Sequence, residues 1–452
     1  NYYNNDEINL SVGHSRLKII DTSDLANQPF SDETGRFILS FNGEIFNYLE
    51  LRKELKSKGY KFKTESDTEV LLYSYIEWKE KCVFKFNGFW SFIIFDKNNK
   101  NFFISRDRFG VKPLYYYFLN NSLVISSELK SFKVLSNQIK IGINLNEIYK
   151  LRKETISEET LLKNVKMLLP GHNIKYNLRN FIIEKWWETA DHLQSFNKNT
   201  DYVEELSFLF RDSCKLRLRS DVPLTTSLSG GLDSSAIVAE INQNYNNLKS
   251  HKSFFLNYEY KDNEQKYVEA LKSKYNLDLD EIKIEKNYSN FDEMKKSTLY
   301  QEKIGDDGIG AWRIYKKMRS ENYRVSLDGR GPDELMGGYN EYQIELFHSS
   351  FLNKIILSNI KKVIKKIIGM KSEIQSKYLY FNPNIKKNLN EKDYEIPHRF
   401  SGMQKVMYHD FHYGSLPLDL EKYDKISMAH SIESREPFLD YRLVELAFSQ
   451  PL

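Results

Sequence analysis

The chain has 452 residues, of which 40% are hydrophobic and 14% aromatic, and this length and composition suffice for two domains with sizeable cores. The formal net charge of +4 is too small to favour a nucleic-acid-binding protein, and no apolar run is long enough to span a membrane. Cys82 and Cys214 are the only cysteines, so a disulfide framework is not expected and a reducing, cytoplasmic location fits.

Short apolar and aromatic runs separated by Asn, Asp and Gly dominate residues 1–185, and this composition is typical of strands. Two segments between these runs, Leu49–Lys58 and Asp67–Trp78, have helical spacing instead. The pattern predicts an α+β domain over residues 1–185, with stacked sheets and the helices outside. The strands are expected at Phe37–Phe41, Gly88–Asp96, Asn101–Ser105, Leu114–Phe118 and Leu123–Ser126.

Asn42 and Gly43 directly follow the first of these strands. A side-chain amide beside a glycine N–H supplies two donors that can converge on a developing oxyanion. The same dipeptide is also very common in hairpin turns. From these two residues alone, both interpretations stay open.

Polar residues over 186–200 predict a linker, and residues 201–452 then form a second domain. In this second part a helix at Tyr202–Leu218 precedes alternating strand-like and helix-like segments. Such alternation predicts a parallel, doubly wound sheet. The segments are Val222–Leu228, Leu232–Ile241, Ser253–Asn257, Glu264–Tyr275 and Tyr323–Leu327.

The octet Leu228–Ser235 joins the end of a strand to the start of a helix through the pair Gly230–Gly231. Adjacent glycines let the backbone approach a ligand closely, and the amides of such a turn form an anion site at the positive end of a helix. Many α/β turns need glycine for packing alone. Here serine hydroxyls flank the glycines and Asp233 can hold a divalent metal against phosphates, which favours a nucleotide pyrophosphate site.

Residues 353–370 place isoleucines and a valine on one helical face and lysines elsewhere. One interpretation is a helix that associates peripherally with a membrane surface or an acidic partner. The other, which we favour, is an ordinary amphipathic helix with a solvated basic face.

The octet resembles the PP-loop of the N-type ATP pyrophosphatases, and other segments narrow the resemblance. In the second half, the segments similar to the synthetase part of glutamine-hydrolysing asparagine synthetases are Ser220–Pro223, Leu327–Leu335, Ser427–Ala429 and Ser431–Asp440. In the first half, the segments similar to the glutaminase part of the same family are Gly13–Leu17, Asn42–Tyr48, Ser66–Glu69 and Arg106–Leu114. These motifs occur in family order along nearly the whole chain.

The resemblance implies an N-terminal nucleophile hydrolase sandwich (αββα) followed by an adenine nucleotide α-hydrolase-like α/β domain. It implies that Arg16 and Asp67 hold the α-carboxylate and α-amino group of glutamine, a pairing that suits the two charges. The backbone of Ile19 and Ile20, together with Glu44, lines the same pocket, and Asn42 and Gly43 form the oxyanion hole.

The family's nucleophile is a cysteine at the mature N-terminus, whereas residue 1 is Asn. We therefore expect the nucleophile upstream of Asn1 and the sequence to be truncated at both ends. Cys82 and Cys214 are expected to be buried structural thiols. On its own, a chain without the nucleophile should not hydrolyse glutamine.

The family activates a substrate carboxylate with ATP, forming an acyl-adenylate and pyrophosphate, before ammonia forms the amide. By motif match, Asp233 and Asp333 are the Mg²⁺ ligands. Asp333 taken alone fits a helix-start acid better, but its place after Gly329-x-Gly331 and before Glu334 favours the metal. The resemblance also implies that Ser229, Gly230, Gly231 and Ser234 cradle the pyrophosphate and that adenosine is contacted by Leu228, Leu256, Asp328 and Gly329.

Arg330 departs from the family, which generally carries Glu or Gln beside the acyl substrate. If its guanidinium faces the acceptor, it should attract an additional carboxylate or phosphate; if it faces solvent, that argument fails. Pro332 also replaces a small residue. Glu433 borders the acceptor pocket as a general base or as a structural partner of Arg435, and the structural role is slightly favoured.

We therefore expect a glutamine-dependent, ATP-dependent amidotransferase, most simply one that converts L-aspartate to L-asparagine. The alternatives are the same chemistry on another carboxylate, such as a glycan uronic acid or a peptide acid, and a non-catalytic family member. The expected partners are small molecules, ATP and Mg²⁺, with a homodimer as one assembly.

Overall fold

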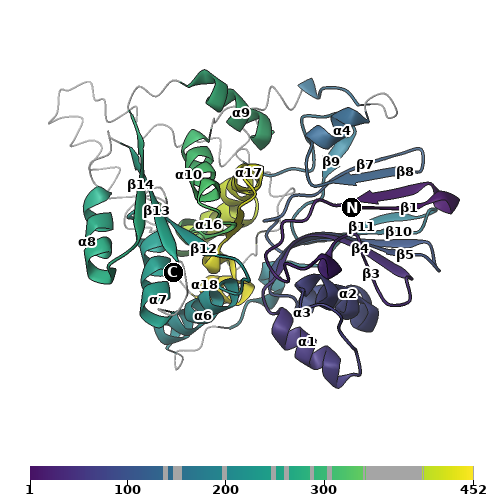
Figure 1. Cartoon of the computed structure of the whole chain (residues 1–452), viewed down its shortest axis with the longest axis horizontal. Helices are drawn as coiled ribbons and strands as arrows, with labels where there is room; N and C mark the ends of the chain where they lie inside the picture. The colour runs from purple at the N-terminus through teal and green to yellow at the C-terminus, as the bar shows by residue number, and fades with distance from the viewer. Residues whose placement is uncertain are drawn as a thin grey trace.

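The computed structural model describes residues 1–135, 141–145, 155–195, 201–245, 251–258, 264–285, 290–302, 308–339, 342, 396, 400 and 402–450. The predicted basic helix over 353–370 lies outside these residues. Figure 1 shows antiparallel sheets on one side, a second sheet with its helices on the other, and the C-terminal helices between them. Within the described residues, no helix has the length and apolar character needed to cross a membrane.

The first half contains a six-stranded antiparallel sheet with the strand order β11-β10-β6-β5-β4-β3. A smaller sheet has the order β8-β7-β9, and β1 (Tyr2–Asn5) pairs with β2 (Leu10–Gly13). The strands of the two larger sheets are β3 (Phe30–Ser31), β4 (Phe37–Ile45), β5 (Gly88–Asp96), β6 (Asn101–Arg106), β7 (Tyr115–Leu119), β8 (Ser122–Ser126), β9 (Val165–Met167), β10 (His172–Tyr176) and β11 (Phe181–Lys185).

Alternating side chains on these strands show how the layers stack. Leu39 and its neighbours on one face of β4 belong to the core shared with α1 (Tyr48–Ser57) and α2 (Asp67–Trp78), whereas Ile38 packs into the core between the two sheets. On β7, Tyr116 faces that same inter-sheet core, and Tyr115 packs with residues of α4 (Lys130–Val134). The order is therefore helix, sheet, sheet, helix, which confirms the expected αββα sandwich.

The second half contains a five-stranded sheet in which every neighbouring pair is parallel, with the order β14-β13-β12-β15-β16. The chain runs outward from β12 to β14 and then returns to β15 on the other side. The order therefore reverses between β12 and β15, which is where open α/β sheets bind ligands. The strands are β12 (Leu224–Leu228), β13 (Lys252–Tyr258), β14 (Leu279–Ile284), β15 (Val325–Leu327) and β16 (Glu433–Arg435).

Helices cover both faces of this sheet, as predicted. Phe255 packs with residues of α7 and α8 on one face, and the adjacent Phe254 packs with α10 and α17 on the other. The longer helices of this half are α6 (Tyr202–Arg217), α7 (Leu232–Asn244), α8 (Gln265–Tyr275), α9 (Phe291–Gln301), α10 (Ile309–Ser320), α16 (Gly402–His412), α17 (Ser415–Ala429) and α18 (Tyr441–Ser449). Shorter elements are α3 (Cys82–Lys85), α11 (Pro332–Met336), η1 (Asp6–Ile8), η2 (Asp24–Ala26), η3 (Lys79–Lys81), η4 (Thr189–His192) and η5 (Pro437–Leu439).

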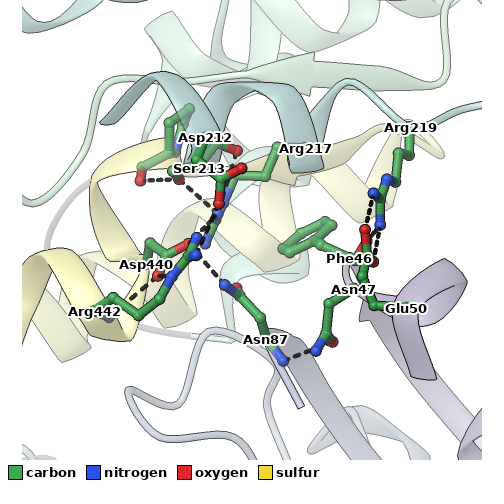
Figure 2. A network of polar contacts seen from close by, with 11 residues as sticks. Phe46, Asn47, Glu50, Asn87, Asp212, Ser213, Arg217, Arg219, Asp440 and Arg442 are labelled. Atoms are coloured by element: carbon green, nitrogen blue, oxygen red, sulfur yellow. Dashed lines mark hydrogen bonds and ion pairs between the residues drawn. The ribbon is translucent and has the colours of Figure 1, made fainter. Parts of the chain in front are cut away.

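Polar contacts, one buried and one at the surface, join the two halves (Figure 2). The side-chain amide of Asn87 donates to Asp440 Oδ2 at 2.7 Å, and the same oxygen lies 3.3 Å from Arg217 Nη1. Nearby, Arg219 donates to both carboxylate oxygens of Glu50, each at 2.6 Å. Because Asn87 and Glu50 of the first half find these partners in the second half, the contact between the halves is specific rather than only apolar.

Both cysteines are buried, as predicted. Burial raises the pKa of the Cys82 and Cys214 thiols well above the usual range, so neither is poised as a thiolate nucleophile.

Candidate active site

The glycine turn after β12 has the geometry that its sequence predicts. Gly230 has a φ of 82°, and a Cβ there would lie 2.6 Å from the carbonyl oxygen of Glu264, so only glycine fits. The amide of Gly231 donates to Ser229 Oγ at 3.2 Å, and the amide of Ser229 donates to Ser234 Oγ at 3.1 Å. Gly231 has no side chain to cap α7, so the first turn of the helix presents amides at the sheet edge.

Gly329 follows β15 and brings the neighbouring segment against this turn. A Cβ on Gly329 would lie 2.8 Å from the Ser234 amide nitrogen and 3.2 Å from Asp233 Cβ. The start of α7 and the loop after β15 therefore touch at the point where the strand order reverses. This places the predicted adenosine-side residue Gly329 and the predicted pyrophosphate cradle in one location.

Asp233 and Asp333 are half-buried and close enough to repel each other. Burial, together with the charge of Asp333, raises the pKa of Asp233 to about 6, and burial also raises the pKa of Asp333. Neither carboxylate forms an ion pair with a cationic side chain among the described residues. Asp333 lies in the first turn of α11, so the helix-start interpretation of this residue is also satisfied.

This donor set fits Mg²⁺ bound together with a nucleotide. Within the described parts of the chain, no group of three or more His, Cys, Asp or Glu side chains could hold a metal alone. Mg²⁺ is typically held by one or two carboxylates and completes its shell with phosphate oxygens and water. A divalent cation would also relieve the repulsion that raises the pKa of Asp233.

Leu228 and Leu256, both expected to contact adenosine, lie toward the carboxyl ends of β12 and β13. Asp328 follows β15 at the same edge but its carboxylate is already occupied within the protein. Its Oδ1 accepts from Ser326 at 2.6 Å, and its Oδ2 accepts from Tyr315 at 2.5 Å and from Ser434 at 2.8 Å. The Asp328 side chain therefore organises the sheet edge.

Arg330 lies inside this same cluster and does not face solvent, so that alternative is wrong. Its Nη1 donates to Asp328 Oδ2 at 2.9 Å and to Glu436 Oε1 at 3.3 Å, while Nη2 donates to the Tyr315 hydroxyl at 3.0 Å. Its guanidinium carbon lies 3.7 Å from the ring centroid of Tyr423. The guanidinium is thus neutralised by carboxylates of the chain itself, and we call Tyr315, Asp328, Arg330, Ser434 and Glu436 the Arg330 cluster.

A cavity of about 1260 Å³ contains every residue predicted for the glutamine pocket. Its lining also includes residues of the second half, so the cavity extends across the contact between the halves. The predicted residues are Arg16, Ile19, Ile20, Asn42, Gly43, Glu44 and Asp67, and the second half contributes Asp424, Lys425, Met428, Ser431 and Glu433. The nucleotide turn does not belong to this lining.

Asn42 and Gly43 lie inside β4, so the hairpin alternative is wrong. They pair with Ser91 and Trp90 of β5, and Gly43 has a φ of 144°. A Cβ on Gly43 would lie 2.0 Å from the carbonyl oxygen of Phe89, so this position requires glycine. The unusual backbone at Gly43 is compatible with an amide turned toward the cavity for an oxyanion.

Arg16 is fixed by the loop that follows it. Its guanidinium donates to the carbonyl oxygens of Ser23 at 3.0 Å, Ile20 at 2.8 Å and Asp21 at 2.6 Å. A guanidinium has five N–H donors, so these bonds leave capacity for a ligand carboxylate. The carbonyl of Ile19 accepts from the amide of Asp221 at 3.1 Å, which ties this pocket to the second half.

Two buried carboxylates give the pocket its negative character. Burial raises the pKa of Glu44 well above its usual range, and the nearby Asp67 adds to this effect. Burial raises the pKa of Asp67 to about 6, although its Oδ2 accepts a hydrogen bond from the Ile45 amide at 3.0 Å. A ligand ammonium would be stabilised here because it compensates buried negative charge.

Glu433 is held by Arg435, whose Nε donates to Glu433 Oε1 at 2.7 Å. The structural partnership predicted for this residue is therefore present. Sequence reasoning missed the partners of Arg330. Ser434 and Glu436 lie in the motif Ser431–Asp440, but the motif does not show that their side chains point toward Arg330. Nothing in the sequence around Tyr315 of α10 indicates that this residue contacts Arg330. It also missed the buried pair of Lys112 and Asp424, which joins the halves at 2.8 Å.

Comparison with known proteins agrees with this arrangement. Residues 1–187 match a glutamine amidotransferase domain, and residues 205–452 match asparagine synthase. The chain belongs to the glutamine-hydrolysing asparagine synthase family. This is a family of glutamine-dependent ligases that use ATP and a carboxylate substrate.

Among its relatives in this family is asparagine synthetase [glutamine-hydrolyzing] 1 of Bacillus subtilis, which is 31% identical over 482 aligned positions that cover 99% of this chain and 75% of the relative. Asparagine synthetase [glutamine-hydrolyzing] 3 of the same organism is 30% identical, in an alignment that covers 98% of this chain and 75% of that relative. Amidase chry2 of Gibberella zeae is 23% identical over 99% of this chain and 75% of its own length. The chain is therefore similar both to proteins named asparagine synthetase and, more distantly, to a protein named amidase.

Proposed function

We propose that the protein transfers the amide nitrogen of glutamine to a substrate carboxylate that ATP activates as an acyl-adenylate, with L-aspartate as the acceptor and L-asparagine as the product. The observation that carries the proposal is the close approach of Gly329, in the segment that leads to Asp333, to Asp233 and Ser234 in the first turn of α7, at the reversal of strand order. The start of α7, which no side chain caps, lies beside two carboxylates that have no cationic partner among the described residues, and this combination suits a metal-bound pyrophosphate.

Charge explains why this reaction needs such a site. A carboxylate must attack a phosphate that is itself negative, and backbone dipoles together with a cation offset the repulsion. Asp233 and Asp333 would hold Mg²⁺, and the amides of the glycine turn with Ser229 and Ser234 would hold the leaving pyrophosphate. Mg²⁺ would supply the positive charge that stabilises the leaving group, while the chain's residues fix its position.

In the first half, we propose that Arg16 binds the α-carboxylate of glutamine and that Asp67 and Glu44 receive its ammonium. Asn42 and the amide of Gly43 would stabilise the oxyanion formed when the side-chain amide is attacked. The shared lining of the cavity supports passage of ammonia toward the second half, since Asp424 and Glu433 face the same space. The proposed division is a glutaminase over residues 1–185, a linker at 186–200 and a ligase over 201–452.

The contacts of Arg330 favour L-aspartate as the acceptor more strongly than the sequence alone does. Asp328 and Glu436 place two carboxylates around one guanidinium, so Arg330 has no unmatched positive charge with which to attract an additional acid. A cluster with excess carboxylate is compatible with the ammonium group of an amino-acid acceptor. The two buried thiols and the small-molecule substrates suit a cytoplasmic enzyme, and a homodimer remains a prediction.

The test compares acceptors in the full-length protein. With ATP, Mg²⁺ and glutamine present, L-aspartate should support pyrophosphate release, whereas a uronic acid or a peptide with an acidic side chain should not. Each assay is repeated with ammonium chloride in place of glutamine, which isolates the ligase. If a uronic acid or acidic peptide is amidated and L-aspartate is not, the proposed acceptor is wrong although the proposed chemistry stands.

A further inference from the structure

Strand β16 faces both sites at once. Side chains alternate along a strand, and here Glu433 and Arg435 lie toward the glutamine pocket while Ser434 and the following Glu436 lie in the Arg330 cluster. The strand is only three residues long and pairs with β15 through Ser326 opposite Ser434. The two sets of side chains are therefore separated by a single residue along the backbone.

On the first face, Arg435 connects the two halves. Its Nη2 lies 3.4 Å from Glu44 Oε2 of the glutamine pocket, and its Nη1 donates to the carbonyl oxygens of Arg217 at 2.8 Å and Arg219 at 2.6 Å. Arg219 in turn donates to the carbonyl oxygen of Phe46 at 2.6 Å, two residues beyond Glu44 (Figure 2). The guanidinium is fully buried, so it has no solvent to compensate a change in these contacts.

On the second face, Ser434 connects β16 to the ligase side. Its hydroxyl lies 2.8 Å from Asp328 Oδ2 and 2.5 Å from Glu436 Oε1, and it accepts from Arg330 Nη1 at 3.1 Å. The backbone adds a further link, because the amide of Asp328 donates to the carbonyl oxygen of Arg435 at 2.9 Å. Arg435 thus touches the Arg330 cluster through its backbone and the glutamine pocket through its side chain.

The contact between Arg435 and Glu44 is incomplete. Among the described residues, Arg435 Nη2 and Glu44 Oε1 are both buried without a hydrogen-bond partner. Buried polar atoms in this state are costly, so the pair gains from a new partner that enters the cavity. Glu44 lines that cavity, and a ligand ammonium arriving there would draw the carboxylate and change its pairing with Arg435.

We propose that Arg435 is a positioning residue that couples occupancy of the glutamine pocket to ligand affinity at the Arg330 cluster, through β16. The inference rests on the proposed function for the identity of the two ligands. Coupling of this kind is reciprocal: if a glutamine-site ligand tightens binding at the ligase site by some factor, the ligase-site ligand tightens the glutamine site equally. The quantity to measure is the ratio of a ligand's affinity with the second ligand bound to its affinity without it. The proposal requires that this ratio differs from one.

The experiment uses calorimetry on the full-length protein with Mg²⁺. L-glutamate occupies the glutamine pocket without being consumed, and a non-hydrolysable ATP analogue and L-aspartate occupy the ligase site. The affinities of the analogue and of L-aspartate are measured with and without glutamate. We expect glutamate to tighten at least one of them about fivefold or more in the unmodified protein.

Arg435→Met should reduce this ratio to about one, and Arg435→Lys, which keeps the charge but not the fork of donors, should restore only part of it. The matched control is Asn87→Ala, which removes another buried bond between the halves, to Asp440, and should leave the ratio unchanged. If Arg435→Met fails to fold, Ser434→Ala removes the link on the other face and should also bring the ratio to about one.

The outcomes separate the two proposals. A ratio of one for both ligands in the unmodified protein, or an unchanged ratio in Arg435→Met or Ser434→Ala, overturns the role of Arg435. If L-aspartate does not bind but the ratio for the nucleotide analogue behaves as expected, the coupling stands and the proposed acceptor fails.

Discussion

Two pairs of carboxylates lie at the carboxyl edge of the parallel sheet, and among the described residues only one of the pairs has a cationic side chain of the protein beside it. Asp328 and Glu436 share Arg330, which lies 2.9 Å from one and 3.3 Å from the other. The charge of Arg330, helped by hydrogen bonds, lowers the pKa of Asp328 to about 2 despite its burial. Asp233, beside Asp333, has a pKa raised to about 6.

The difference lies in how much positive charge each pair has before a ligand arrives. The first pair shares the guanidinium of Arg330, so part of its negative charge is already compensated by the chain. The second pair keeps its mutual repulsion beside the uncapped start of α7, an arrangement that becomes favourable when a cation and an anion arrive together. Four predictions test this contrast and its counterpart in the glutamine pocket.

The largest expected effect is on Asp233. Asp233→Asn should lower the ammonia-dependent rate of pyrophosphate release about a thousandfold, because the metal's stabilisation is worth several kcal/mol. The thermal unfolding midpoint should stay equal or rise, since the substitution removes repulsion with Asp333. A rate within tenfold of the unmodified protein at saturating Mg²⁺ would show that this pair does not bind the metal.

Arg330→Met should act mainly on stability. It leaves Asp328 and Glu436 buried without their cation, and breaking a buried pair in this way costs about 3–5 kcal/mol. Urea unfolding measures the loss. Adding Glu436→Gln to the same chain should recover part of it, and no recovery would mean that Glu436 is not a true partner.

Asn42→Ala should separate the two activities. Removal of one oxyanion donor lowers kcat about 10²–10³-fold, so glutamine hydrolysis should fall by that amount while the ammonia-dependent reaction remains within about twofold. Both rates are measured on the same preparation of the full-length protein. A parallel loss of both activities would instead assign Asn42 to the packing of β4.

The smallest effect is a dependence on pH. Burial raises the pKa of Asp67 to about 6, so its carboxylate is ionised above that pH and becomes protonated below it. Because an ammonium requires the ionised form, L-glutamate affinity should weaken by about tenfold per unit well below pH 6. Calorimetric titration between about pH 5 and 8 checks this, and an affinity that stays constant to pH 5 would remove Asp67 from the site.

The parts of this structure that local chemistry determines were predictable. The Gly230–Gly231 turn has a local sequence signal, since glycine permits its positive φ and a helix follows directly, and β5 and α2 have the bounds that their apolar patterns predicted. The Asn42–Gly43 pair could not be decided because its local turn preference is overridden by pairing with β5. In the same way, β16 has the sequence Glu-Ser-Arg, with no apolar alternation to mark a strand.

The position of Arg330 was beyond local reasoning for a different reason. The sequence places a cation beside the acceptor motif but does not reveal that Tyr315 and Glu436, far apart along the chain, meet it there. Considered alone, the positive charge of Arg330 suggests that it attracts an acidic group of the substrate. The carboxylates of Asp328 and Glu436 already compensate this charge, so the conclusion is reversed. Long-range pairing of buried charges is therefore the information that the fold adds.

The most direct test of the proposed function follows nitrogen and phosphate together. The full-length protein is supplied with glutamine labelled with ¹⁵N at the side-chain amide, L-aspartate, ATP and Mg²⁺, and the products are quantified. We predict labelled L-asparagine with one AMP and one pyrophosphate for each amide formed. Cleavage of ATP to ADP and phosphate, or amide formation without ATP, would contradict it.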